Sequence, residues 1–215
     1  MTRTVGAPAS RRLTPADSAA KRALDVAVSA AALALLSPLF ALVALLIQLD
    51  SSGPVFFTQV RSGYRGGPFR MYKFRTMVQD AEDRLAEVLD SNVHEDSRLY
   101  KIPNDPRVTR VGAVLRRHSL DEVPQLINVL KGEMSLIGPR PLTLDEDRHV
   151  EGWARLRADA RPGITGPWQV SGRNALGFDE MMRLDCGYVA NWSFRGDLAL
   201  LARTPQVVLR GQGAL

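Results

Sequence analysis

The chain has 215 residues, of which 45% are hydrophobic and 24% charged, so it suits one domain or two small ones and is not globally disordered. Its single cysteine, Cys186, excludes an internal disulfide framework and a Cys-rich metal site, and the three histidines are too widely spaced for a zinc motif. The net charge of +5 favours an anionic partner, which could be nucleic acid, acidic lipid or a phosphorylated substrate.

The composition of residues 1–50 predicts a tail followed by a membrane segment. Residues 1–20, rich in Arg, Ala, Ser and Pro in their first part, are expected to be a disordered tail. Residues 26–49 carry no charge. A bilayer takes about 20 apolar residues to span, so residues 21–50 are expected to form a membrane helix. This run is too long and begins too late to resemble a cleaved signal peptide.

The middle of this segment argues against a plain span. Ser37-Pro38 lies at its centre, where proline removes a backbone donor and should kink or break the helix. Basic residues flank the run on both sides, and the positive-inside rule would place both ends in the cytoplasm. A re-entrant helix satisfies both facts, but membranes also tolerate a proline-kinked span. On the residues alone the two arrangements stay open.

Residues 51–215 are expected to form a cytosolic catalytic domain that lies on the membrane. The composition predicts a β-hairpin from residues 55–60 and 69–74. Helices are expected at 80–89, 120–130, 145–160, 181–190 and 198–210, the last interrupted at Thr204-Pro205, and residues 108–117 read as helical or mixed. Residues 94–105 and 161–177 are expected to be loops. The predicted class is therefore α+β and helix-rich.

The strongest local candidate for chemistry is the acidic pair Asp121 and Glu122. With Ser119 and Pro124 it forms a helix start, in which Ser119 and Glu122 match a capping box. The pair could serve only as a cap that complements the helix dipole. Alternatively, an aspartate can attack phosphorus and a neighbouring glutamate can hold Mg²⁺, which prefers oxygen ligands.

Several basic segments have two interpretations as well. Lys73 and Arg75 after the hairpin, and Arg116 before the acidic pair, could grip a diphosphate or be solvated surface cations. Arg140 lies in a rigid Pro-Arg-Pro triplet, which alone is weak evidence. Residues 163–169 could be a nucleotide-binding loop or a plain turn. No P-loop, G-x-S-x-G or H-E-x-x-H motif occurs.

Taken together, these segments resemble the bacterial sugar transferase family, the monotopic polyprenyl-phosphate phosphoglycosyl transferases. The order and number of the motifs carry the resemblance, which runs from about residue 21 to residue 204. The matching residues are Lys21-Arg22-x-x-Asp25, Ser37-Pro38, Gly53-Pro54-Val55-Phe56-Phe57 with Gln59, Arg61 and Gly63, Lys73-Phe74-Arg75-Thr76-Met77, Leu115-Arg116-Arg117-x-Ser119-Leu120-Asp121-Glu122-x-Pro124-Gln125, Met134-Ser135-Leu136-Ile137-Gly138-Pro139-Arg140-Pro141, Arg161-Pro162-Gly163-Ile164-Thr165-Gly166 and Trp168-Gln169-Val170-Ser171-Gly172-Arg173.

The resemblance implies a reaction. Family members transfer a sugar-1-phosphate from a nucleotide diphosphate sugar, usually a UDP-sugar, to undecaprenyl phosphate, and release nucleoside monophosphate with Mg²⁺ as cofactor. It implies that Asp121 is the nucleophile, through a covalent aspartyl-phosphosugar, and that Glu122 binds the metal. The reaction would be the first membrane step of exopolysaccharide, capsule or glycoconjugate synthesis.

The resemblance also implies where the chain sits and what it binds. The substrate-binding residues would be Lys73, Arg75, Arg116, Arg140, Gln169 and Arg173. The membrane helix would be re-entrant, with its bend at Ser37 and Pro38, and short amphipathic helices such as 198–210 would rest on the lipids. The expected location is the cytoplasmic face of the bacterial inner membrane. Nucleic acid is not an expected partner, and a homodimer stays open.

Two departures from larger family members stand out. Those carry extra N-terminal membrane helices and a further soluble region, whereas only a short tail precedes Lys21, so the chain resembles a minimal catalytic unit. Pro167 stands where the family loop often carries a bulkier apolar residue, which leaves nucleotide and sugar preference open.

Two other functions are the alternatives to the transferase: a non-enzymatic basic membrane adaptor and a nucleic-acid-binding protein. The first predicts no Mg²⁺-dependent nucleotide release, and the second predicts salt-sensitive DNA binding.

Overall fold

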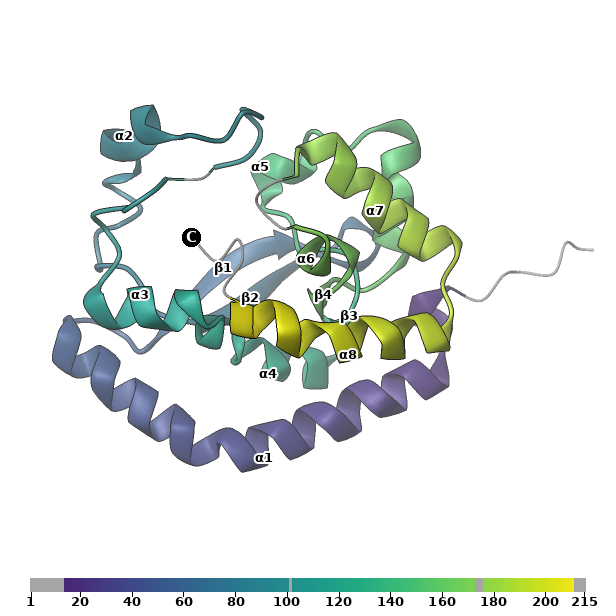
Figure 1. Cartoon of the computed structure of the whole chain (residues 1–215), viewed down its shortest axis with the longest axis horizontal. Helices are drawn as coiled ribbons and strands as arrows, with labels where there is room; N and C mark the ends of the chain where they lie inside the picture. The colour runs from purple at the N-terminus through teal and green to yellow at the C-terminus, as the bar shows by residue number, and fades with distance from the viewer. Residues whose placement is uncertain (1–13, 101, 173–175, 211–215) are drawn as a thin grey trace, which may run out of the picture.

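The computed structural model describes residues 14–100, 102–172 and 176–210. Figure 1 shows one long bent helix, α1, along one side of the molecule, with the other elements gathered against it. The helices and strands are α1 (Ala19–Asp50), β1 (Phe56–Ser62), β2 (Pro68–Phe74), α2 (Leu85–Val88), α3 (Arg110–Arg117), α4 (Gln125–Lys131), β3 (Ser135–Ile137), α5 (Leu144–Asp147), β4 (Gly163–Thr165), α6 (Pro167–Val170), α7 (Phe178–Ala190) and α8 (Phe194–Arg210). Short 3-10 helices are η1 (Pro15–Asp17), η2 (Tyr64–Gly66), η3 (Leu89–Ser91), η4 (Leu120–Glu122) and η5 (Gly152–Asp159).

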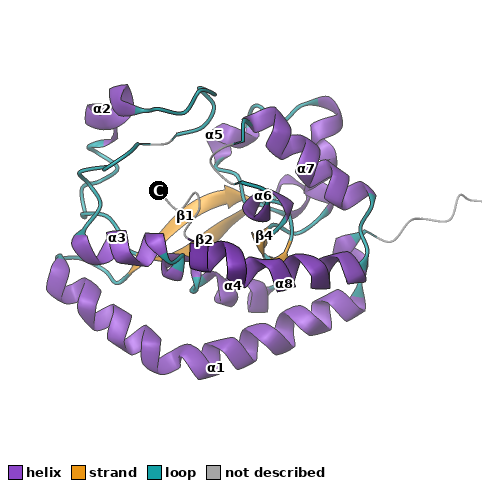
Figure 2. Ribbon diagram, in the orientation of Figure 1, coloured by secondary structure: helices purple, strands orange, loops and turns teal. Residues whose placement is uncertain are grey.

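Two small sheets lie among the helices, as Figure 2 shows. The predicted hairpin is confirmed: β1 and β2 pair antiparallel, with Phe56 opposite Phe74 and Ser62 opposite Pro68. The second sheet was not predicted. In it β3 and β4 pair in parallel, with Ser135 opposite Gly163. The class is therefore helix-rich with small sheets, as the sequence indicated.

Helix α1 has an unusual distribution of polarity. In its first arm the fully buried residues are the polar Lys21, Asp25 and Ser29, which recur every four residues, while Val28, Ala32 and Leu33 beside them are partly buried against the core. On the outer side Leu35 is 80% exposed and Leu49 76% exposed. A surface helix of a soluble protein has the opposite arrangement, with its apolar stripe against the core. The outer face of α1 therefore suits lipid.

The polar side of the first arm bonds to the rest of the protein. Lys21 Nζ lies 2.7 Å from the buried Asp197 carboxylate and donates to the carbonyl of Ile137 at 2.8 Å. Asp25 accepts from the backbone N–H of Leu136 at 2.9 Å. The Lys21-x-x-x-Asp25 spacing thus ties α1 to the strand β3 and to the start of α8.

The second arm of α1 packs through apolar contacts instead. Val43 and Ile47 are buried with Phe74 at the end of the hairpin and with Leu115 of α3. At the end of the arm, Asp50 accepts from the backbone N–H of Val111 at 2.8 Å. Both ends of α1 are therefore attached to the same globular body.

The prediction that the membrane helix is broken at Ser37-Pro38 is wrong in that detail. Figure 1 shows α1 bent near its middle, and the helix continues through Pro38. Proline cannot donate to the carbonyl of Ala34, four residues back. The hydroxyl of Ser37 donates to that carbonyl at 2.9 Å instead, so the lost backbone bond is replaced within the turn.

The predicted N-terminal boundary also shifts. Residues 1–13 of the predicted tail lie outside the described residues, whereas residues 14–20 contain η1 and the first turn of α1. Helix α1 begins at Ala19 because the Ser18 side chain accepts from the backbone N–H of Lys21 and so caps it.

Several expected elements differ in extent. The helix expected at 145–160 is divided into α5 and η5, because Gly152 has a positive φ of 52°. The expected loop 161–177 holds β4 and α6, which form through tertiary contacts. Pro205 lies inside α8 without interrupting it. The helix expected at 80–89 is reduced to α2 and η3.

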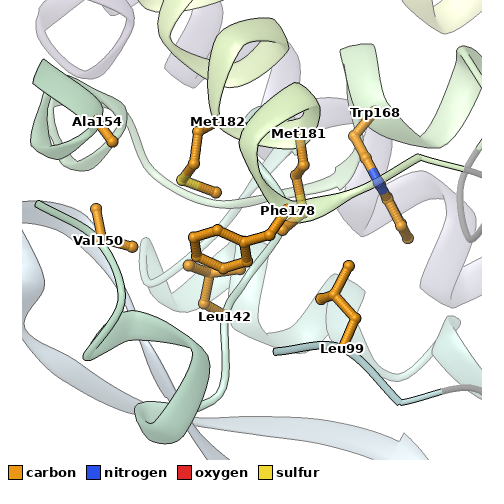
Figure 3. Packing of buried hydrophobic residues seen from close by; sticks show 8 residues of the cluster. All are labelled: Leu99, Leu142, Val150, Ala154, Trp168, Phe178, Met181 and Met182. Carbon is orange, nitrogen blue, oxygen red and sulfur yellow. The ribbon is translucent and has the colours of Figure 1, made fainter. Parts of the chain in front are cut away.

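Three apolar clusters hold these elements together. The central one joins the inner face of the hairpin to α4 and β3 through Met71, Val129 and Ile137. A second, shown in Figure 3, surrounds Phe178 at the start of α7 and includes Trp168. The third is the cluster around Val43 and Phe74 described above. These clusters fix the strands and short helices that carry the candidate site.

Candidate active site

The acidic pair Asp121 and Glu122 lies in η4, between α3 and α4. Ser119 precedes it with a left-handed backbone, φ 54°, which turns the chain from one helix into the next. The prediction that Ser119 forms a capping box is wrong. In its left-handed conformation the Ser119 side chain makes no capping hydrogen bond to η4. Asp121 is 7% exposed, whereas the side chain of Glu122 is 36% exposed.

Lys73, at the end of β2, reaches both carboxylates. Its Nζ lies 2.7 Å from Glu122 Oε1 and 3.7 Å from Asp121 Oδ2. The next residue, Phe74, is buried in the cluster against α1, so the strand end is fixed and successive side chains point to opposite faces. The structure thus brings Lys73 to the acidic pair, although Glu122 lies 49 positions further along the chain, as the sequence predicted.

Arg116, in the last turn of α3, is the second cation of the site. Its Nε donates to Thr76 Oγ1 at 2.9 Å, which holds the guanidinium toward the end of the hairpin. Its charge also acts on Asp121. Burial raises the pKa of Asp121, Lys73 lowers it, Glu122 raises it and Arg116 lowers it, and the net direction is upward.

Arg140 sits on the loop after β3, between two prolines. Its guanidinium lies 4.6 Å above the ring of Trp168, and its Nη2 lies 3.4 Å from Glu146 Oε1. Arg61, at the end of β1, lies 3.6 Å from the other oxygen of Glu146. Burial and then the charge of Arg140 lower the pKa of Arg61 to about 10, while Glu146 and Glu122 oppose that shift.

Arg61 is a site residue that the predicted set omitted. Its electrostatic effect connects the Arg140 loop with Glu122 of the acidic pair. The sequence contained a signal for it, because Arg61 occurs in the Gln59-x-Arg61-x-Gly63 motif directly after the predicted strand.

Arg75 was expected to bind substrate, but the structure places it elsewhere. Its guanidinium donates to the carbonyls of Ser51 and Ser52, the latter in a very short contact, at the end of α1. Strand β2 ends at Phe74, so Arg75 does not continue on the face of Lys73. It closes the turn between the membrane helix and the hairpin, and it is 6% exposed.

The last two predicted substrate residues lie in or beyond α6. Gln169 is buried in α6, next to the Trp168 ring that supports Arg140. Arg173 lies outside the described residues.

The Arg140 loop rests on closely packed backbone. Gly138 donates to the carbonyl of Thr165 at 2.9 Å, and Gly163 donates to the carbonyl of Pro139 at 2.8 Å. A Cβ atom at Gly138 would lie 2.2 Å from the carbonyl oxygen of Arg161, and one at Gly166 would lie 2.0 Å from that of Gly138. Only glycine fits at these positions, and the loop is held without intervening side chains.

The donor set fits a divalent hard cation that shares its ligands with a substrate. No group of three or more His, Cys, Asp or Glu side chains suited to a metal occurs among the described residues. Asp121 and Glu122 offer two adjacent carboxylates. Mg²⁺ is commonly held by one or two carboxylates together with waters and substrate phosphates.

The arrangement as a whole suits chemistry on a phosphate. A buried carboxylate with a raised pKa lies beside a lysine and an arginine, and further guanidiniums lie on the neighbouring loop. The carboxylate can act as a nucleophile, and the cations can neutralise an anionic substrate that would otherwise be repelled.

Comparison with known proteins supports this interpretation. The family model described as bacterial sugar transferase matches residues 16–211. The exopolysaccharide production protein ExoY of Rhizobium meliloti is 42% identical over 93% of this chain and 90% of its own length. The UDP-glucose:undecaprenyl-phosphate glucose-1-phosphate transferase of Caulobacter vibrioides is 42% identical over 90% of the chain and 71% of its own length. The undecaprenyl-phosphate galactose phosphotransferase of Salmonella typhimurium is 42% identical over 90% of the chain and 41% of its own length.

Proposed function

Since the chain belongs to the bacterial sugar transferase family, we propose that it transfers a sugar-1-phosphate from a nucleotide diphosphate sugar to undecaprenyl phosphate. The names of the relatives support the lipid acceptor and a place in exopolysaccharide synthesis, and one of them supports a UDP-linked donor. The observation that carries the proposal is the buried Asp121 carboxylate, 3.7 Å from Lys73 Nζ and under the charge of Arg116.

The proposed reaction has two displacement steps at one phosphorus. An Asp121 oxygen attacks the sugar-bearing phosphorus of the donor. A P–O bond to that oxygen forms, and the P–O bond to the nucleoside monophosphate breaks. A phosphate oxygen of undecaprenyl phosphate then attacks the same phosphorus and displaces Asp121, giving undecaprenyl diphosphate sugar and the free carboxylate. Splitting the transfer in this way lets one site serve a soluble donor and a lipid acceptor in turn.

The surrounding cations have distinct roles in this scheme. The charges of Lys73 and Arg116 favour the ionised form of Asp121, which burial disfavours, and they offset the repulsion between two anionic reactants. Arg140 is free to contact the diphosphate, because its side chain is 28% exposed and its prolines and Trp168 limit its movement. Glu122, with Asp121 beside it, would hold Mg²⁺, which supplies charge neutralisation for phosphoryl transfer when bound.

We also propose that α1 is re-entrant and that the catalytic domain lies on the cytoplasmic face of the inner membrane. The support is that both arms of α1 attach to one globular body, the first through Lys21 and Asp25 and the second through Val43 and Ile47. A straight span would place these ends about 30 Å apart across the hydrocarbon core. The bend at Ser37-Pro38 leaves the apolar middle to enter one leaflet, while the site stays at the level of the headgroups.

A donor screen tests the proposed function. Detergent-solubilised protein is incubated with undecaprenyl phosphate, Mg²⁺ and each of a panel of UDP-sugars, and nucleoside monophosphate release is measured. We expect release with at least one donor, dependent on the lipid phosphate. If no nucleotide sugar gives Mg²⁺-dependent release, the adaptor interpretation replaces the enzymatic one.

A further inference from the structure

Arg140 is held from several sides by residues that come from distant parts of the chain. Its backbone carbonyl accepts from Arg157, which is paired with the fully buried Asp185 at 2.8 Å. Its side chain lies on Trp168 and against Glu146. A surface arginine needs none of this support, so the position of this guanidinium is specified by the fold.

Glu146 is the residue that joins the two guanidiniums of this region. Its Oε2 lies 3.6 Å from Arg61 Nη1 and its Oε1 lies 3.4 Å from Arg140 Nη2, and the residue is 6% exposed. Burial acts to raise the pKa of Glu146, but the charges of Arg140 and Arg61 outweigh it and hold that pKa below its ordinary value. The carboxylate of Glu146 is therefore ionised. It offsets the repulsion between the two neighbouring positive charges of Arg61 and Arg140.

The helix-capping role of Glu146 explains the contact of only one of its two carboxylate oxygens. The residue does form a capping box with Thr143 at the start of α5, in which Oε2 accepts from the Thr143 N–H at 2.7 Å. A neutral glutamine could make that bond equally well. The other oxygen, Oε1, faces Arg140. The charge of Glu146 is thus needed for the arginines and not for the helix.

The cluster also has more donors than the protein uses. The Nε atoms of Arg61 and Arg140 are both buried and have no hydrogen-bond partner in the described part of the chain. Among Arg61, Arg140 and Glu146 one carboxylate faces two guanidiniums, so these three side chains together carry a net positive charge. Surplus donors and surplus positive charge together suit an anionic ligand of the phosphate class.

From this geometry we infer that Glu146 is a positioning residue for donor binding. Its carboxylate, shared with Arg61, holds the Arg140 guanidinium flat on Trp168 so that the remaining N–H groups of Arg140 meet the diphosphate of the donor. Glu146 itself does not touch the substrate. The inference rests on the proposed function, because it takes the ligand of Arg140 to be a nucleoside diphosphate group.

UDP binding to the full-length detergent-solubilised chain, measured by titration calorimetry, tests this role without turnover. We expect Glu146→Gln, which preserves the length and the capping oxygen, to weaken UDP binding about 10-fold, a typical effect of removing a group that orients a ligand-binding side chain. Asp96→Asn is the matched control. Asp96 also accepts from an arginine, Arg98, and from the first backbone N–H of a helix, that of Phe178. We expect the Asp96→Asn variant to bind UDP with the affinity of the wild type.

A double-mutant cycle separates positioning from a general folding defect. In an Arg140→Gln background, Glu146→Gln should change UDP affinity less than twofold, because the residue it positions is gone. A folding defect would weaken binding equally in both backgrounds and would overturn the inference, as would wild-type affinity in the Glu146→Gln single variant. If the wild type binds UDP with this dependence on Glu146 but transfers no sugar-phosphate, the proposed reaction fails and the positioning role stands.

Discussion

Lys73 is 1.0 Å nearer to Glu122 than to Asp121, with Nζ–oxygen distances of 2.7 Å and 3.7 Å. The lysine therefore forms its direct ion pair with the more exposed acid and acts on the buried one mainly through its charge. This division suits a site in which Asp121 must keep a free oxygen to react and Glu122 is the group that ligands can reach.

The first prediction concerns the covalent step. Asp121→Asn removes the charged oxygen while preserving shape, and we expect sugar-phosphate transfer to fall by about 1,000-fold or more, with membrane association unchanged. The check is incubation of the wild type with donor labelled in its sugar-linked phosphate, followed by quenching and protein mapping. Label should be found on Asp121. Product formation without any labelled protein would exclude the covalent intermediate.

The second prediction concerns pH. Burial raises the pKa of Asp121 above its ordinary value of 3.8, and only the ionised form attacks phosphorus. Activity should therefore be present above the raised pKa and be lost as the pH falls through it. Lys73→Gln removes a charge that lowers this pKa, so the acid limb of the normalised pH–rate profile should move upward by about one pH unit. The control is Arg84→Gln, which removes a partly exposed cation paired with Glu87 and should leave the acid limb in place.

The third prediction concerns Mg²⁺. Chelation with EDTA should abolish nucleotide release, and added Mg²⁺ should restore it, because the site provides only two carboxylates against an anionic substrate. Glu122→Gln should raise the Mg²⁺ concentration for half-maximal rate about 10-fold. The exposed Glu87→Gln serves as the control. An undiminished rate after chelation would contradict a metal requirement.

The fourth prediction concerns the attachment of α1. Lys21→Met leaves the fully buried Asp197 without its ion-pair partner, and breaking such a pair destabilises a protein by about 3 kcal/mol. For a chain of this size that corresponds to a fall in Tm of about 6–12 °C. Thermal unfolding in detergent measures it, with Arg84→Met, which breaks an exposed pair, as the control. If the Tm of Lys21→Met lies within about 2 °C of the wild-type Tm, which is the shift expected from loss of a surface pair, the buried pair contributes little to stability.

The fifth prediction concerns topology. With the buried Cys186 replaced by Ser, a cysteine is placed at Thr4 in the N-terminal tail or at the exposed Asn191 after α7. In intact cells both should resist a membrane-impermeant thiol reagent, and both should react after permeabilisation. Labelling of the tail from outside while position 191 stays protected would establish a span and contradict the re-entrant helix.

The sequence predicted those parts of the molecule that depend on local pattern. The hairpin, the α4 helix and the bend at Pro38 follow from alternation, periodicity and proline chemistry. The parts that it did not predict depend on tertiary partners. Strand β4 exists because β3 lies beside it, and Pro205 is accommodated within α8.

The candidate site shows the same division between local and tertiary information. Lys73, Arg116 and Asp121 were predicted and do lie together. The family resemblance of the Lys73-Phe74-Arg75 segment predicts a substrate contact for Arg75, but its guanidinium donates to the carbonyls of Ser51 and Ser52 after the strand has ended. Arg61 was omitted, because nothing in a single sequence shows that residue 61 lies opposite residue 146.

The glycine contacts behind Arg140 have a consequence for how this scaffold could change its choice of sugar. Gly138 and Gly166 meet backbone directly, so enlarging either residue would displace the whole loop rather than reshape its surface. Substitution at these two positions is therefore a poor route to a change in donor preference. If the proposed function holds, side chains outside these two glycine positions can vary without moving the loop that carries Arg140.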